Sequence, residues 1–205
     1  LIAVVFGVVI GAVASSGHFK WLGQGLMTFT LIGVSIPVFW LGLILMYLFA
    51  IKLCLFPPSG YGGGSLRNLF LPAVTLSFAS MATVARVIRS SFLDTINEDY
   101  VRTARSKGLG DLAIYGKHVL KNALIPVVTI VGTDFGSYLS GSVLTESIFG
   151  WPGLGRLIVQ AILKRDFPII MGGVLFMAFM FVIVNLIVDI SYGIIDPRMR
   201  ERGVD

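Results

Sequence analysis

Long apolar runs separated by shorter polar segments dominate this chain. Four of the runs approach the roughly 20 residues that a helix needs to cross a bilayer. They cover residues 27–50, 69–88, 123–143 and 169–190. None of them alternates apolar and polar positions as a membrane β-strand does. Because backbone groups in lipid must hydrogen-bond within their own segment, we expect each run to form a helix.

A shorter apolar run opens the chain at residues 1–14. It is too short to cross a bilayer, and it starts at Leu1 with no basic segment before it, unlike a signal peptide. We interpret it as the end of a crossing whose beginning is missing, which makes the chain truncated at its N-terminus. The predicted fold class is all-α: a polytopic membrane helix bundle in one domain, residues 1–205, with five hydrophobic segments.

Composition supports the bilayer as the solvent of this chain. Of its residues, 56% are hydrophobic and only 13% are charged, whereas soluble domains carry about 25% charged residues. The net charge of +5 does not indicate a nucleic-acid partner, because the basic residues stand at the ends of apolar runs. With a single cysteine and two distant histidines, the sequence predicts no catalytic site, no metal site and no cofactor of its own.

Lysine and arginine residues are distributed unevenly between the two sides of the predicted bundle. Segments 15–26, 86–121 and 191–205 share one side and hold 11 of the 16, while the other side holds 5. The positive-inside rule then places the C-terminus and the polar segment 94–122 in the cytoplasm. The loop 144–168 is expected on the opposite, extracytoplasmic face, with a short amphipathic or re-entrant helix in it.

The polar interruption at residues 94–122 has the pattern of two short helices. Asp99 near the start of the first helix and Arg105 near its end suit the helix dipole. Gly108 can end this helix, and a second is expected from about Asp111 to Lys121.

The start of the first short helix has two expected N-caps, Asp94 and Asn97. Apolar residues recur among the charges of the segment, which a fully solvated loop would not need; they are Tyr100, Val101, Leu109, Leu112, Ile114, Tyr115 and Val119. We therefore predict a compact knob at the membrane surface.

Several segments of the chain together resemble the permeases of binding-protein-dependent ABC importers, most closely the dipeptide/oligopeptide/nickel subfamily. The matching segments are residues 99–108 with 117–129, 146–156 with 165–168, 185–189 with 195–198, and the stretches 35–37 and 57–60. They keep their order and cover essentially the whole chain. The resemblance implies six membrane helices in the intact subunit.

One part of the general importer motif is missing. The motif is Glu-Ala-Ala, three residues and then glycine, but Arg102, Thr103 and Ala104 fill its first three places before Gly108. The peptide subfamily commonly makes this substitution. Glu98 lies four residues earlier, outside the motif position.

The resemblance implies a transport subunit and not an enzyme. Such a permease pairs with a second, homologous permease, two cytoplasmic ATPase subunits use ATP and Mg²⁺, and an extracytoplasmic binding protein delivers the substrate. The chain itself has no Walker A sequence, which agrees with ATP chemistry in partner subunits. The implied substrate is a di- or oligopeptide, with a nickel chelate or glutathione as the alternative.

In this family, segment 94–122 corresponds to the cytoplasmic coupling loop. The expected ATPase-coupling residues are Glu98, Asp99, Tyr100, Val101, Arg102, Thr103, Ala104, Arg105, Lys107, Gly108 and Leu109. Among them, Tyr100, Val101 and Leu109 are expected as apolar anchors in a groove of the ATPase. The basic residues would steer the approach and set the register.

The substrate path is expected around Asp134, near the middle of the run 123–143. A charge there costs about 2.5–3.5 kcal/mol on insertion scales, so it should face the interior. Relatives more often carry an uncharged polar residue at about this place. Asp134 is therefore either a path residue that favours a cationic group or a protonated or hydrogen-bonded residue between helices. Ser137 and Ser35 are placed on the same path.

Two rival classes of membrane protein are disfavoured by the sequence. A secondary transporter is expected to hold coupling-ion carboxylates in several helices, whereas only Asp134 lies deep in an apolar run. A membrane enzyme needs a cluster of titratable groups at one depth, which the sequence lacks.

Overall fold

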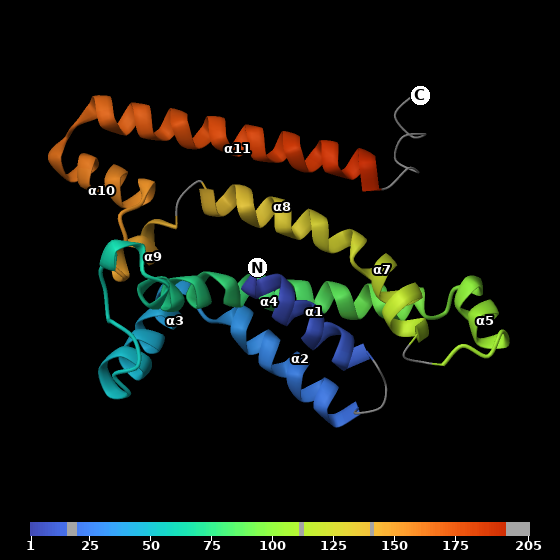
Figure 1. Cartoon of the computed structure of the whole chain (residues 1–205). Coiled ribbons are helices and arrows are strands. Elements are labelled where there is room, and N and C mark those ends of the chain that lie inside the picture. Colours follow the sequence, from blue (N-terminus) through green and yellow to red (C-terminus); the bar gives the residue numbers. More distant parts are fainter. Residues whose placement is uncertain (16–19, 111–112, 140–141, 196–205) are drawn as a thin grey trace. The chain divides into compact units, whose positions relative to one another are not determined.

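The computed structural model describes residues 1–15, 20–110, 113–139 and 142–195, and helices make up most of these (Figure 1). The longer helices are α1 (Ile2–Ser15), α2 (Lys20–Ser35), α3 (Val38–Leu45), α4 (Leu66–Thr95), α5 (Asp99–Ser106), α8 (Ile125–Leu139), α10 (Leu154–Lys164) and α11 (Phe167–Ile195). Shorter elements are η1 (Met46–Lys52), η2 (Gly62–Gly64), η3 (Ile114–Val119), α7 (Leu120–Ala123) and α9 (Val143–Ile148).

The helices form two compact units. Among the described residues, the first unit contains 1–34, 79–131 and 188–195, and the second contains 35–78 and 132–187. Helices α4, α8 and α11 therefore contribute residues to both units.

Among the described residues, two helices are long and apolar enough to cross a membrane alone, α4 and the Phe167–Val188 part of α11. The number rises to four if each of two bent helix pairs is a single span. These four places coincide with the four long apolar runs of the sequence. The fifth segment is present as α1, an apolar helix of 14 residues, and a bundle of five or six crossings stays a prediction.

The run 27–50 is not the straight crossing that its composition predicts. Helix α2 already begins at Lys20, inside the segment expected to be a loop, and the helical run is broken between Ser35 and Val38. Pro37 lies at the break and is the N-cap of α3. A proline ring clashes with the preceding turn and pushes the residue before it out of the helical region, which explains the break.

In the first unit, α1 packs so closely on α4 that glycine is required at the contact. A Cβ atom on Gly7 would lie 2.7 Å from the Cβ atom of Val84, and one on Gly11 would lie 2.7 Å from the Cβ atom of Ile88. Both contacts are much shorter than ordinary van der Waals distances. Small residues that let two helix backbones approach are typical of membrane helix pairs.

In the second unit, Phe149 fills the centre of a small apolar cluster with Ala50 and Leu71. Gly42 on α3 faces the ring, because a Cβ atom there would lie 3.3 Å from Phe149. The side chain of Phe149 is 2% exposed, so it joins α3, η1 and α4 from the short segment after α9.

Candidate functional site

Helix α5 is held by its apolar face. Val101 is fully buried and Ala104 is 6% exposed, and both belong to a cluster with Ile88 and Phe92 of α4 and Ile114 of η3. Burying a valine side chain such as that of Val101 stabilises a structure by about 1.5–3 kcal/mol. The first helix of the expected knob thus packs on α4 and η3 within the first unit.

The second helix of the knob differs from its prediction. Residue Asp111, the expected start, lies outside the described residues, and the helix is seen as η3 followed by α7, which ends at Ala123. The wider turn of η3 includes Tyr115, whose ring lies 5.5 Å from that of Phe92, centroid to centroid.

The start of α5 also differs from the sequence prediction. Glu98 stands at the N-cap, and its side chain makes no capping hydrogen bond. Asn97 instead donates from Nδ2 to the carbonyl of Leu93 at 2.9 Å, so it closes the preceding helix α4. Asn side chains bond locally to whichever backbone group is free, and here that group is a carbonyl at the end of α4.

The end of α5 is closed by the glycine that the sequence singles out. The amide of Gly108 donates to the carbonyl of Arg105 at 2.9 Å, and the amide of Leu109 donates to the carbonyl of Ala104 at 3.3 Å. This is the pair of bonds of a Schellman motif. Gly108 has a φ of 78°, in the left-handed region that favours glycine.

Tyr100 ties α5 to the following helix. The Nδ2 amide of Asn122 donates to the phenol oxygen of Tyr100 at 2.6 Å, across 22 residues of sequence. With the apolar seat and the glycine cap, this bond fixes the orientation of α5 in its unit.

The opposite face of α5 carries charge into the solvent. Asp99, Arg102, Thr103, Arg105 and Lys107 are all exposed. Arg102 and Asp99 form an ion pair of 3.6 Å, with 73% and 96% of their side chains exposed. Such exposed pairs add little stability, so this face does not serve to hold the helix in place.

One of the three expected anchors is wrong. Val101 has no exposed surface, so it cannot enter a groove of another protein. Tyr100 and Leu109 are 40% and 42% exposed and remain available for such a contact. Val101 stabilises the seat of the helix instead.

A second organised polar site lies in the other unit, at the start of α10. An Oε atom of Glu146 accepts a hydrogen bond of 2.8 Å from the amide of Arg156, in the first turn of α10. The carboxylate fills the space beside Gly153, which is the N-cap of the helix. Sequence reasoning placed Glu146 in a motif but missed this cap, because the carboxylate comes from a different helix.

The loop before α4 is joined to the same region. The amide of Gly60 donates to the carbonyl of Phe149 at 2.8 Å, and the rings of Tyr61 and Trp151 meet edge to face at 5.1 Å. A cleft of about 270 Å³ lies beside Trp151, between α4 and α9. The amphipathic helix expected within residues 144–168 is present as α10.

The three expected path residues lie on two elements of the second unit. Asp134 is half-buried on α8, and Ser137, one turn later, is exposed and donates to the carbonyl of Thr133 at 2.9 Å. Ser35 is exposed at the end of α2. Asp134 and Ser137 thus share one face of α8, whereas Ser35 belongs to a different helix.

Metal binding finds no support in the described part of the chain. There, no three His, Cys, Asp or Glu side chains lie close enough together to hold an ion. The Asp196–Arg198 part of the last matching segment lies outside the described residues.

Comparison with known proteins identifies the class to which this helical architecture belongs. Residues 4–201 match the family of binding-protein-dependent transport system inner membrane components. Because the match covers nearly the whole chain, the chain belongs to this family. It is a transport permease family of the inner membrane, and the apolar helices α4 and α11 agree with that location.

Individual relatives carry transport names. A putative peptide transport system permease protein of Brucella abortus is 43% identical over 97% of this chain and 65% of its own length. The di/tripeptide permease of Pseudomonas aeruginosa is 40% identical over 98% of this chain and 68% of its own length. A glutathione transport permease of Salmonella choleraesuis is 43% identical over 97% and 64%. The chain thus spans about two thirds of the length of these relatives.

Replacing Gly108 by alanine is expected to loosen α5. The left-handed conformation costs a residue with a Cβ atom about 1–2 kcal/mol, although no atom would clash with it. Hydrogen exchange of the α5 amides in detergent should become faster by roughly tenfold. Gly110→Ala is the matched control, because Gly110 also has open space but no positive φ. Equal exchange in the two variants would contradict the cap.

Adding a methyl group at Gly153 is expected to displace Glu146. The backbone there has a φ of −130°, which alanine adopts freely, so the cost comes from the carboxylate alone. We expect Gly153→Ala to lower the free energy of unfolding by about 1–3 kcal/mol. In the double variant Gly153→Ala/Glu146→Ala, the two losses should be less than additive by at least about 0.5 kcal/mol.

The control for this cycle is Gly172→Ala, at a helical glycine with open space around it. Thermal or denaturant unfolding in one detergent measures all five proteins: the unmodified chain, Gly153→Ala, Glu146→Ala, the double variant and the control. Strict additivity of the two losses would show that Glu146 and Gly153 do not share the site.

Proposed function

We propose that this chain is the membrane permease of an ATP-driven ABC importer and forms half of the translocation path for di- or oligopeptides. Family membership and the peptide-transport names of two relatives support the proposal. Its complete form pairs with a second, homologous permease. Two cytoplasmic ATPase subunits use ATP and Mg²⁺, and an extracytoplasmic binding protein delivers the substrate.

The observation that carries the mechanism is the two-faced character of α5. Its apolar face is fixed in the first unit by Val101 and Ala104, and its charged face is exposed. A short rigid helix of this kind can receive a displacement from a soluble protein. We assign α5 as the coupling helix, with Tyr100 and Leu109 as the apolar contacts and the basic residues around them setting register.

The packing of the seat supports a route for the movement. Val101 lies in one cluster with Ile88 of α4 and with Val127 of α8. Because packed cores move as rigid parts and resist local deformation, a shift of α5 would be passed to the inner parts of α4 and α8. In the proposed cycle, closure of the ATPases moves α5. The movement of α4 and α8 that follows changes the side of the membrane to which the path is open.

The proposed orientation has segment 94–122 and the C-terminus in the cytoplasm and segment 144–168 on the extracytoplasmic face. The distribution of lysine and arginine supports it. The binding protein would then approach the side of the chain on which α10 and the Glu146 cap lie.

Glutathione is the second candidate substrate, because a glutathione permease is 43% identical to this chain. Glutathione is itself a tripeptide with a free amine, so the two candidates share the same chemistry at a path residue. Asp134 is the proposed residue for such a cationic group.

Neutralising two exposed cations of α5 should weaken ATPase recruitment. In Arg102→Gln/Lys107→Gln the buried face of the helix is untouched, so unfolding should not change, while co-purification of the ATPases should fall by roughly tenfold at physiological salt. Lys52→Gln is the control, an exposed lysine at the end of η1 in the other unit. Full recruitment of the ATPases by the double variant would contradict the assignment of α5 to the ATPase interface.

Replacing Asp134 by asparagine should change substrate preference more than total uptake. We expect the ratio of uptake of a free-amine dipeptide to its N-acetylated form to fall by about tenfold in proteoliposomes with the complete transporter. Asp94→Asn, an exposed carboxylate at the end of α4, should leave the ratio unchanged. An unchanged ratio in Asp134→Asn would exclude Asp134 as a path residue and leave its other interpretation, a protonated or hydrogen-bonded residue between helices.

A further inference from the structure

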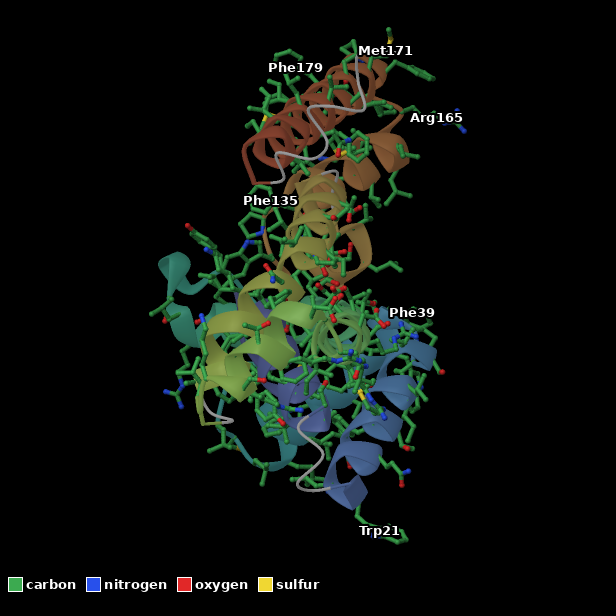
Figure 2. All side chains as sticks on the ribbon, turned by 90° about the vertical axis from the view of Figure 1, so that its right-hand side faces the viewer. Trp21, Phe39, Phe135, Arg165, Met171 and Phe179 are labelled. Atoms are coloured by element: carbon green, nitrogen blue, oxygen red, sulfur yellow. The ribbon has the colours of Figure 1, made fainter. Side chains whose placement is uncertain are left out.

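The turn between α10 and α11 presents two cations beside exposed apolar side chains. We define the elbow as residues 162–167. Lys164 and Arg165 are exposed, and the apolar neighbours Ile162, Leu163 and Phe167 are 53%, 79% and 67% exposed. In Figure 2 the Arg165 side chain projects away from the ribbon.

The elbow stands where a membrane span begins. The span in α11 starts at Phe167, and only 6% of its most apolar window is buried within the chain. Helix α10 lies directly before α11 along the chain (Figure 1), and Ile158 of α10 contacts Gly173 of α11. An amphipathic helix joined to the end of a span lies in the interface, where apolar side chains reach the acyl region and cations reach the headgroups.

Arg165 occupies a position that favours glycine. Its φ is 57°, and the amides of Arg165 and Asp166 donate to the carbonyls of Ile162 and Ala161 at 3.0 and 2.9 Å, which is a Schellman motif. A residue with a Cβ atom is unfavourable there. An arginine at this position therefore indicates that its side chain is used.

The charges of the elbow are not neutralised within the described part of the chain. Neither Lys164 nor Arg165 has an ion-pair partner there. Asp166, the carboxylate next to Arg165 in the sequence, accepts a hydrogen bond of 3.3 Å from the amide of Ile169. It therefore caps a backbone amide in the first turn of α11. Two cations at headgroup depth attract the phosphate of an anionic lipid.

We propose that the elbow is a binding site for an anionic phospholipid. The guanidinium of Arg165 and the ammonium of Lys164 hold the headgroup phosphate, and Leu163 and Phe167 contact the acyl chains. A soluble protein partner suits this surface less well, because Leu163, which is 79% exposed, is apolar and stands beside the start of a span.

Native mass spectrometry of the full chain tests the site with two lipids, phosphatidylglycerol and phosphatidylcholine. The unmodified protein should retain phosphatidylglycerol in preference to phosphatidylcholine. In Lys164→Gln/Arg165→Gly, binding of phosphatidylglycerol should weaken by roughly 30-fold, while that of phosphatidylcholine stays the same.

Glycine is chosen at residue 165 so that a loss of lipid binding in Lys164→Gln/Arg165→Gly cannot be attributed to unfolding. Because the backbone at residue 165 favours glycine, Arg165→Gly should keep or raise the unfolding temperature. A variant that unfolds as usual and has lost lipid selectivity supports the site. Lys52→Gln, which removes an exposed lysine elsewhere, should leave the selectivity intact.

Two results would overturn the proposal. The first is full phosphatidylglycerol selectivity in Lys164→Gln/Arg165→Gly. The second is unchanged lipid binding with loss of binding-protein docking in the assembled transporter, which would assign the elbow to a protein interface. The lipid measurement needs no transport activity, so it does not depend on which substrate the chain carries.

Discussion

The burial of Val101 is the interaction on which the candidate site depends. An isolated helix of eight residues is too short to be stable in water, and the charged face of α5 adds little. The helix exists in place because Val101 and Ala104 fill a cluster to which α1, α4 and η3 also contribute. The same contact joins α5 to the apolar helices α1 and α4.

The site at the start of α10 depends on a polar contact instead. Glu146 closes the first turn of α10 from another helix, and Gly153 leaves room for the carboxylate. Apolar packing resists small displacements in every direction, whereas a cap of this kind holds one geometry and is lost once that geometry is lost. The sites in the two units are thus supported by different kinds of contact.

Sequence patterns located most of the helices and the glycine that ends α5, because runs of apolar residues and glycine caps are local signals. Four features depend on contacts that no local pattern shows. The sequence predicts Val101 as an external anchor, because an apolar position on a short helix does not reveal which protein covers it. Asn97 served the preceding helix, and Glu146 capped a helix that begins after it. The break at Pro37 depends on whether neighbouring helices keep the run continuous, which the sequence does not show.

The shortness of α5 has a thermodynamic consequence. With 8 residues, its helical state is linked to the packing beneath it, and any ligand of the charged face selects that packed state. Occupancy of the face therefore raises the stability of the apolar cluster by mass action, in proportion to the logarithm of ligand concentration. The folding of this cluster and the binding of a ligand to the charged face are, in this respect, one equilibrium.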